Sequence, residues 1–173
     1  MIEATAALLL EEGCERMTID AVAERSGVAR STIYRNWEDR SALLMEAVDC
    51  ALPRGQEHNT GSLTGDLIEM GHHLATMLTN GALGKLLPSL VGAAAFDQAL
   101  SVRLQRMAEE RSGHVRKIFE RGVLRDEIAN ADLDGRVERF TAPFFTRHLL
   151  NGRSLDADFI AAQVAAALTD PEG

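Results

Sequence analysis

Three arginines and two aromatic residues lie within one short stretch of an otherwise acidic chain. Tyr34 is the only tyrosine of the 173 residues and Trp37 is the only tryptophan, and Arg30, Arg35 and Arg40 surround them. Guanidinium groups match the geometry of phosphate and of the guanine edge, and a tyrosine adds a hydroxyl and a flat ring. This combination of residue types is typical of contact with a nucleic acid.

The distribution of charge permits such a contact. A net charge of −8 argues against a protein that coats nucleic acid indiscriminately, because such proteins are usually basic. Residues 25–40 nevertheless carry four arginines against only Glu38 and Asp39. Since screening at physiological salt acts over about 8 Å, a partner that touches this segment responds mainly to its local positive charge.

Composition indicates a globular protein of one domain or two small modules, with 46% hydrophobic and 25% charged residues. No apolar run approaches the roughly 20 residues of a membrane span, and the first residues lack the cationic region of a secretory signal. Cys14 and Cys50 fall in predicted helices, which fits a reducing compartment better than a disulfide framework. We expect a cytoplasmic protein with no membrane segment.

Apolar residues recur at three- and four-residue spacing along the whole chain, which predicts an all-α fold of about nine helices. A polar, turn-rich stretch at residues 54–62 separates a DNA-binding domain, residues 1–52, from a C-terminal domain, residues 53–173. The expected helices span residues 2–12, Thr18 to Arg25 or Ser26, 30–36, a segment capped by Asp39 and ended by Pro53, 63–79, 82–95, 97–122, 133–151 and 156–169. Gly13 is expected to end the first helix in the left-handed conformation, Gly27 to end the second, and Pro88 and Pro143 to kink theirs.

The stretch TIDAVAERSGVARSTIYRNW has the spacing of a helix-turn-helix. Ala23 lets two helices approach, Gly27 four residues later makes the tight turn, and Val22, Val28 and Ile33 lock the crossing. The second helix of such a unit lies in the major groove of DNA, where its outward side chains reach bases and phosphates.

With Ile33 facing inward, the other side chains of this second helix are available to DNA. Thr18 and Arg40 begin the flanking helices and are expected to bind the DNA backbone. Trp37 is expected to pack where the third and fourth helices meet, with its indole N–H able to turn toward a phosphate. The predicted DNA-binding residues are Thr18, Arg30, Ser31, Thr32, Tyr34, Arg35, Trp37 and Arg40. The alternative is that these are solvated arginines on a small helical bundle.

Residues 2–48, through IEATAALLLEEG, MTIDAVAERSGVARSTIYRNW and EDRSALLMEAV, resemble the DNA-binding domain of TetR-family transcriptional regulators. The resemblance implies a homodimer that binds a palindromic double-stranded DNA operator, usually as a repressor, and is released by a small-molecule effector held in the C-terminal domain. It also implies DNA contacts for the residues named above and a largely structural role for Trp37. RGVLRDEI, APFFTRHLLNGRSLDADF and an alanine-rich last helix resemble one C-terminal subgroup of the family more loosely.

Two departures from the family pattern concern DNA binding. Members commonly carry a short basic arm before the first helix, whereas this sequence begins at the helix itself, either through a truncated start or because this source of phosphate contacts is missing. Ala29 also replaces the serine that often precedes the recognition helix. Losing a good N-cap costs about 1 kcal/mol, so this helix is expected to fray more easily.

The C-terminal domain is expected to carry both the dimer contact and the effector cavity. Two helices from each subunit would form a four-helix interface, aided by alanines at 161, 162, 165 and 166; the alternative is that they pack within one subunit. The predicted interface residues are Val137, Phe140, Phe145, Phe159, Ile160, Val164, Ala167 and Leu168. The predicted cavity residues are Met70, His73, Met77, Leu87, Phe96, Met107 and Phe144, although methionine and aromatic residues at helical spacing more often form an ordinary core.

The sequence predicts no enzyme, no metal and no cofactor. Glu69 and His72 match one Glu-x-x-His element of a helical di-iron site, but such sites need a second element, which is missing. No serine or cysteine lies next to a convincing base. The rival hypotheses are a helical ligand-binding or scaffolding protein that has lost operator binding and, from another class, a helical metalloenzyme.

Overall fold

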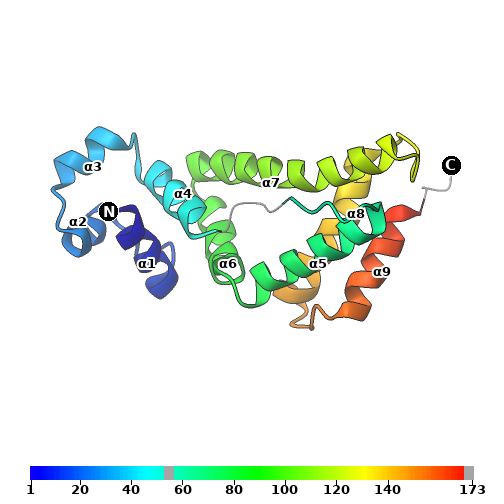
Figure 1. The fold of residues 1–173 in the computed structure, drawn as a ribbon. Helices are drawn as coiled ribbons and strands as arrows, with labels where there is room; N and C mark the ends of the chain where they lie inside the picture. Colours follow the sequence, from blue (N-terminus) through cyan, green and yellow to red (C-terminus); the bar gives the residue numbers. More distant parts are fainter. Residues whose placement is uncertain (53–56, 170–173) are drawn as a thin grey trace. The chain divides into compact units, whose positions relative to one another are not determined.

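The computed structural model describes residues 1–52 and 57–169, and every regular element within them is helical (Figure 1). The elements are α1 (Ile2–Glu12), α2 (Ile19–Ser26), α3 (Arg30–Asn36), α4 (Arg40–Ala51), α5 (Leu63–Thr79), α6 (Ala82–Ala94), α7 (Gln98–Leu124), α8 (Leu133–Phe145), the π-helix η1 (Thr146–Leu150) and α9 (Ala157–Leu168). The all-α prediction is confirmed. Across the described residues, no helix combines the length and the apolar character needed to cross a membrane.

Side-chain caps explain where the short N-terminal helices begin. The Thr18 hydroxyl accepts a hydrogen bond from the Ala21 N–H (3.1 Å), and the Asp39 carboxylate accepts one from the Ala42 N–H (2.7 Å). Each satisfies one of the backbone donors that a helix start leaves free. Ala29, before α3, has extended backbone angles and makes no side-chain cap, as the sequence predicted.

The two glycines that end α1 and α2 differ. Gly27 lies in the left-handed region at φ 69° and ψ 11°, which confirms the prediction for the tight turn. Gly13 has a positive φ of 81° but a ψ of 178°, so the prediction of a left-handed cap is wrong there. Its chain leaves the helix in an extended direction that is essentially restricted to glycine.

The prediction of one helix over residues 133–151 is wrong in detail. The α-helix ends at Phe145, and a π-helical turn follows, in which the Asn151 N–H donates to the Thr146 carbonyl (3.1 Å). Pro143 lacks the N–H of a regular helical turn, and the wider turn begins three residues later. Pro53, expected to end the fourth helix, lies outside the described residues, and α4 ends at Ala51.

Packing divides the chain into two units. Of the described residues, unit 1 holds 1–52 and 81–108, and unit 2 holds 57–80 and 109–169. The long helix α7 therefore contributes its first part to unit 1 and the remainder to unit 2. This is a division by packing, and the predicted domain boundary between residues 52 and 53 stays a prediction.

In unit 1, α4 packs on α1 and meets the start of α7. Leu9 and Leu44 are fully buried or nearly so in this core. The Ser41 hydroxyl at the start of α4 donates to the Asp97 carboxylate just before α7 (2.8 Å), and the Arg103 guanidinium lies 3.1 Å from the Asp39 carboxylate. These bonds join the first turn of α4 to the first turns of α7.

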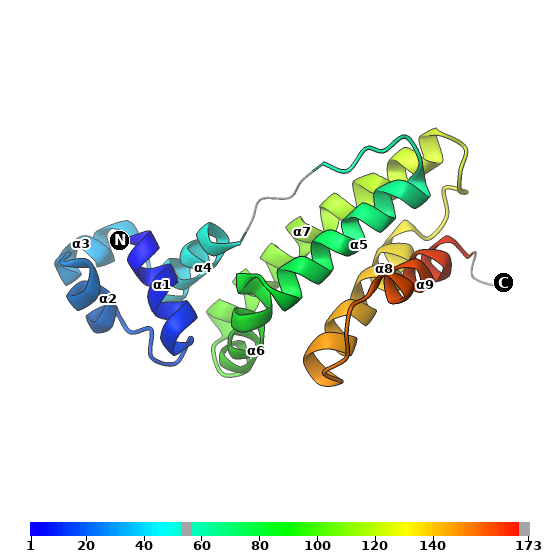
Figure 2. The same ribbon diagram turned by 60° about the horizontal axis from the view of Figure 1, so that its bottom comes forward.

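In unit 2, α5, α8 and α9 pack around an aromatic core, with α8 and α9 side by side (Figure 2). The rings of Phe140, Phe144 and Phe159 follow one another, with centroids 5.5 and 5.1 Å apart. Gly71 on α5 lies so close to Ile160 of α9 that an added Cβ would come within 2.5 Å of its Cγ2 atom. The small residue therefore permits the close approach of α5 and α9.

Candidate nucleic-acid interface and ligand cavity

The turn between α2 and α3 fixes how α3 is presented. Gly27 supplies the left-handed backbone of the turn, and Val22 and Ile33 are buried at 0% and 1% exposure on the facing sides of the two helices. Val28 is half-buried in the turn. Because α3 has only seven residues, this apolar contact, rather than its own length, holds it in place.

The outer face of α3 is polar and open. Arg30, Ser31, Tyr34 and Arg35 are exposed, and the Tyr34 side chain, at 61% exposure, is the most accessible aromatic residue of unit 1 after Phe96. Thr32 is half-buried beside them. The structure thus brings together the five predicted contact residues of α3 on one small helix.

The two arginines of α3 differ in their surroundings. The Arg30 guanidinium lies 2.7 Å from the Asp20 carboxylate of α2, and both side chains are 63% exposed. Such exposed pairs contribute little because water screens them. Arg35 forms no ion pair with any described residue. Both guanidinium groups can therefore exchange their surroundings for a phosphate or a base at low cost.

Thr18 lies at the start of α2, where its exposed hydroxyl accepts the capping hydrogen bond from Ala21. A hydroxyl that accepts one bond still has its own proton to donate. Thr18 can therefore cap α2 and donate to a phosphate at the same time.

Arg40 and Trp37 are half-buried and form hydrogen bonds with other groups of the chain. Arg40 donates to the main-chain carbonyls of Met17 (2.6 Å) and Cys14, so it holds the connection between α1 and α2 against α4. The Trp37 indole N–H donates to the Glu46 carboxylate of α4 (2.7 Å) and is not turned outward. Trp37 therefore lies at the α3–α4 junction, as expected. Arg40 was expected to bind the DNA backbone, but its guanidinium is bonded to the main chain.

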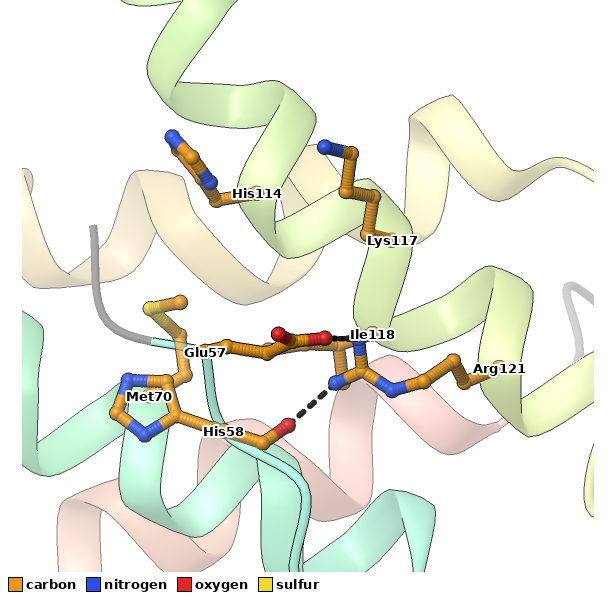
Figure 3. A pocket seen from close by; sticks show the side chains of 7 residues that line it. All are labelled: Glu57, His58, Met70, His114, Lys117, Ile118 and Arg121. Atoms are coloured by element: carbon orange, nitrogen blue, oxygen red, sulfur yellow. Dashed lines mark hydrogen bonds and ion pairs between the residues drawn. The ribbon is translucent and has the colours of Figure 1, made fainter.

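Unit 2 contains a cavity of about 260 Å³ between α5, α7 and the segment that precedes α5 (Figure 3). Its lining residues are Glu57, His58, Met70, His114, Lys117, Ile118 and Arg121. Met70 and Ile118 are buried and supply the apolar part, while the α7 residues His114 and Lys117 are exposed. The cavity therefore combines an apolar floor with a polar and mainly cationic rim.

Of the seven predicted cavity residues, only Met70 lines this cavity. His73 lies just behind its wall, with its ring centroid 5.7 Å from that of His58. Burial lowers the pKa of His73, and the charges of His58 and Arg111 lower it further. His73 therefore stays neutral more readily than an exposed histidine.

The other predicted cavity residues lie elsewhere. Phe144 and Met77 are buried in the core of unit 2, and Leu87, Phe96 and Met107 belong to unit 1. Phe96, between α6 and α7, is 96% exposed. Met77 and Phe144 therefore belong to the ordinary core, which is the alternative that the sequence left open.

The cationic side of the cavity was missed, although the sequence carries a signal for it. His114, Lys117 and Arg121 are spaced three and four residues apart, so they share one face of α7. A search for apolar and methionine side chains overlooks such a face. Helical spacing of the charged residues would have found it.

A buried acid supports the cavity from behind. Asp66 has no solvent exposure and accepts hydrogen bonds from the Thr60 N–H (2.6 Å) and hydroxyl (2.9 Å). Arg121 and Arg125 each place a guanidinium nitrogen 3.3 Å from its carboxylate. Burial acts to raise the pKa of Asp66, but the hydrogen bonds outweigh burial, so this pKa lies below its ordinary value.

Six of the eight predicted interface residues are buried within the chain itself: Val137, Phe140, Phe159, Ile160, Val164 and Ala167. Phe145 and Leu168 are partly exposed. The structure corrects the expectation that this stripe faces a partner, because α5, α8 and α9 use it as their own core. The outer face of α9 instead exposes the four small residues Ala161, Ala162, Ala165 and Ala166.

Two family models match the chain. Residues 1–47 match "Bacterial regulatory proteins, tetR family", and residues 57–167 match "Tetracyclin repressor-like, C-terminal domain". The chain is 29% identical over 156 residues to the HTH-type transcriptional regulator YdeS of Bacillus subtilis, an alignment that covers 88% of this chain and 78% of YdeS. It is 31% identical over 165 residues to the DNA-binding transcriptional repressor TetR of Mycobacteroides abscessus, covering 91% of this chain and 84% of that protein.

Solved structures show the same architecture. The TetR family transcription regulator SCO0332 superposes with a TM-score of 0.75 at 26% identity, covering 98% of this chain and 96% of that one. A TetR-family regulator from Rhodococcus sp. superposes with a TM-score of 0.66 at 18% identity, covering 96% and 94%, which shows the common fold.

Proposed function

This chain belongs to the TetR family of bacterial transcriptional regulators, and we propose that it binds a palindromic operator as a homodimer and releases it when a small molecule occupies unit 2. Members of the family are DNA-binding regulators and not enzymes. The observation that carries the proposal is α3, a short helix held by the buried contact of Val22 and Ile33, with its arginines and Tyr34 open to solvent.

The proposed contacts follow from the exposure of each side chain. Arg35, which is unpaired among the described residues, would bind a guanine edge or a phosphate through both arms of its guanidinium. Tyr34 would place its hydroxyl on a phosphate, and Arg30 would exchange Asp20 for one. Ser31, Thr32 and Thr18 offer hydroxyl donors. Arg40 and Trp37 act indirectly, by holding the α1–α2 connection and the α3–α4 junction.

The homodimer is proposed on the exposed alanine face of α9. Because alanines at 161, 162, 165 and 166 carry no long side chains, two copies of α9 can approach closely there. A two-fold dimer would present its recognition helices about 34 Å apart, one helical turn of DNA, and read two half-sites. Leucine substitutions at these alanines would block the close approach of the two copies of α9. Sedimentation should then show monomers in place of dimers.

Release by an effector is proposed as a shift between two conformations. A ligand that binds better to the conformation with wrongly spaced recognition helices lowers operator affinity by mass action. Repression is the proposed sign of control, since the Mycobacteroides abscessus relative is named a repressor. Because a bacterial chromosome lies in the cytoplasm, the proposal includes a cytoplasmic location.

The direct test is binding of the purified protein to DNA upstream of its own gene at two salt concentrations. Specific binding should weaken as salt rises, because each neutralised phosphate releases counterions. Arg35→Ala should weaken it by roughly tenfold to a hundredfold, and the matched control Arg106→Ala, an exposed arginine of α7, should leave it within twofold.

The rival is a helical ligand-binding or scaffolding protein that no longer reads DNA. If no upstream fragment forms a specific complex at either salt concentration, the rival is favoured and the operator proposal is wrong. If Arg35→Ala and Arg106→Ala weaken binding equally, α3 is not the reading element.

A further inference from the structure

The cavity of unit 2 holds one of the chain's own carboxylates close to a cation that is only partly satisfied. The Glu57 carboxylate lies 3.8 Å from the Arg121 guanidinium, and its side chain remains 81% exposed (Figure 3). An ion pair this long and this exposed contributes little to stability. Glu57 is therefore a weak and replaceable partner for Arg121.

Two buried polar atoms of the lining have no hydrogen-bond partner among the described residues: Arg121 Nε and His58 Nε2. Buried donors and acceptors are usually satisfied, so these two atoms are available to water or to a ligand that enters the cavity. Lys117 adds an exposed ammonium on the same face of α7 that forms no ion pair with any described residue. The groups of the lining without a partner among the described residues are therefore a guanidinium nitrogen, an imidazole nitrogen and an ammonium.

The rest of the lining sets the size and character of the ligand. Met70 and Ile118 give an apolar floor, at 4% and 2% exposure. At about 260 Å³ the cavity lies just below the range of roughly 300–1,000 Å³ that is typical of pockets for drug-sized ligands. A small molecule with an apolar body and one anionic end fits both the floor and the rim.

We propose that this cavity binds a small organic carboxylic acid as its anion, with the carboxylate taking the place of Glu57 at Arg121 and pairing with Lys117. The apolar body would lie on Met70 and Ile118. Charge-assisted hydrogen bonds to a guanidinium and an ammonium favour a carboxylate over its neutral amide.

The same arginine gives the site a means of control, which rests on the proposed regulator function. Besides Asp66 and Glu57, Arg121 donates to the main-chain carbonyl of His58. Arg121 therefore holds Glu57 and His58, which follow α4 of the DNA-binding domain along the chain. A ligand that displaces Glu57 removes one of the two contacts by which Arg121 holds this segment.

The binding test uses the full chain with benzoate and hexanoate and, as neutral isosteres, benzamide and hexanamide. Titration calorimetry at constant ionic strength gives the dissociation constants. We expect at least one acid to bind and its amide to bind at least roughly tenfold more weakly. Absence of binding by both acids, or equal binding of an acid and its amide, would overturn the proposal.

Two substitutions should change the affinity for the acid in opposite directions. Lys117→Met should weaken it roughly tenfold, whereas Glu57→Gln should strengthen it severalfold by removing the internal competitor. Both side chains are exposed, so neither change threatens folding. The matched controls Lys85→Met and Glu69→Gln, exposed residues outside the lining, should leave affinity within twofold. Changes of the same sign in the two cavity variants would contradict the exchange of carboxylates.

Control is tested separately by hydrogen exchange and by operator release. Bound acid should speed amide exchange in residues 57 and 58. At an acid concentration near the wild-type dissociation constant, the acid should lower operator affinity in the wild type and much less in Lys117→Met, which binds the acid roughly tenfold more weakly. Unchanged or slower exchange in that segment would overturn the coupling. If no operator complex forms even without acid, the regulator function fails, while the calorimetric result on the acid stands independently.

Discussion

Arginines of α3 and at the end of α7 form ion pairs in different surroundings: the carboxylate partner is exposed at α3 and buried at the end of α7. Arg30 lies 2.7 Å from Asp20, yet both side chains are 63% exposed. Arg121 and Arg125 lie farther from Asp66, at 3.3 Å, but that carboxylate is completely buried. The shorter pair is the weaker one, because water screens charges at the surface much more than in the interior.

This difference matches the two tasks that we propose. A side chain that must exchange its partner for DNA has to be held loosely, and α3 offers such side chains. A side chain that keeps a cavity and its neighbouring segment in place has to be held firmly. Asp66 holds Arg121 of α7 and Arg125 just after it in this way. Four substitutions or conditions test this contrast.

Asp66→Asn should have the largest effect. It removes the buried charge that Arg121, Arg125 and the Thr60 N–H and hydroxyl share. We expect the free energy of unfolding to fall by roughly 3 kcal/mol, the lower end of the range for breaking a buried pair, because both guanidinium groups keep some access to water. Urea denaturation measures it. A loss below about 0.5 kcal/mol, typical of surface pairs, would remove the contrast.

Acid should abolish the difference between the wild type and Asp66→Asn. Since the pKa of Asp66 is lower in the folded than in the unfolded protein, its contribution is fully present above the ordinary value of 3.8 and is lost as the pH falls through the folded pKa. Denaturation curves at pH 7 and at pH values below 3.8 should show the two proteins converging. Divergence toward low pH would mean that Asp66 is not stabilised as an anion.

Ala29→Ser tests how loosely α3 is held. Ala29 already has the extended backbone angles of a capping residue but offers no acceptor to the first turn of α3. A serine hydroxyl should stabilise the helix start by about 1 kcal/mol, measured as a rise in the free energy of unfolding. Ala29→Val, which cannot cap, serves as the control. Equal effects of both changes would show that capping does not limit this helix.

Asp20→Asn should have the smallest effect. It frees Arg30 and removes a negative charge near the proposed DNA surface, so operator affinity should rise by a few-fold, worth less than about 1 kcal/mol. Glu24→Gln removes the same charge from the same helix without touching a paired arginine. If the two variants bind DNA equally well, the Arg30–Asp20 pair does not restrain Arg30.

Local features of this chain were predictable. The helix bounds agree within two residues for all but the eighth predicted helix, because apolar spacing and the caps at Thr18 and Asp39 act within one or two turns. The hinge of Val22, Gly27 and Ile33 was predictable for the same reason, since its residues are close neighbours in sequence. The exception, residues 133–151, required knowledge of how the backbone continues after Pro143.

Side-chain partners from distant parts of the chain were not predictable. Arg40 donates to the carbonyls of Met17 and Cys14, and the Trp37 N–H donates to the Glu46 carboxylate, and none of these partners was predicted. A guanidinium or indole N–H has many acceptors within reach of a folded chain, and sequence spacing does not say which is nearest.

The sequence by itself determined that this protein is all helical, that it carries a helix-turn-helix and that residues 25–40 have a local excess of positive charge, because each depends on residues within a few turns of one another. Only the tertiary structure decided which face of α9 is exposed and where the cavity lies. Phe140, Phe159 and Ile160 became core and left the alanines outside, and Lys117 and Arg121 met Glu57 across the chain. An apolar stripe is buried equally well against its own chain or a partner, and only the packing of α5, α8 and α9 settles the choice.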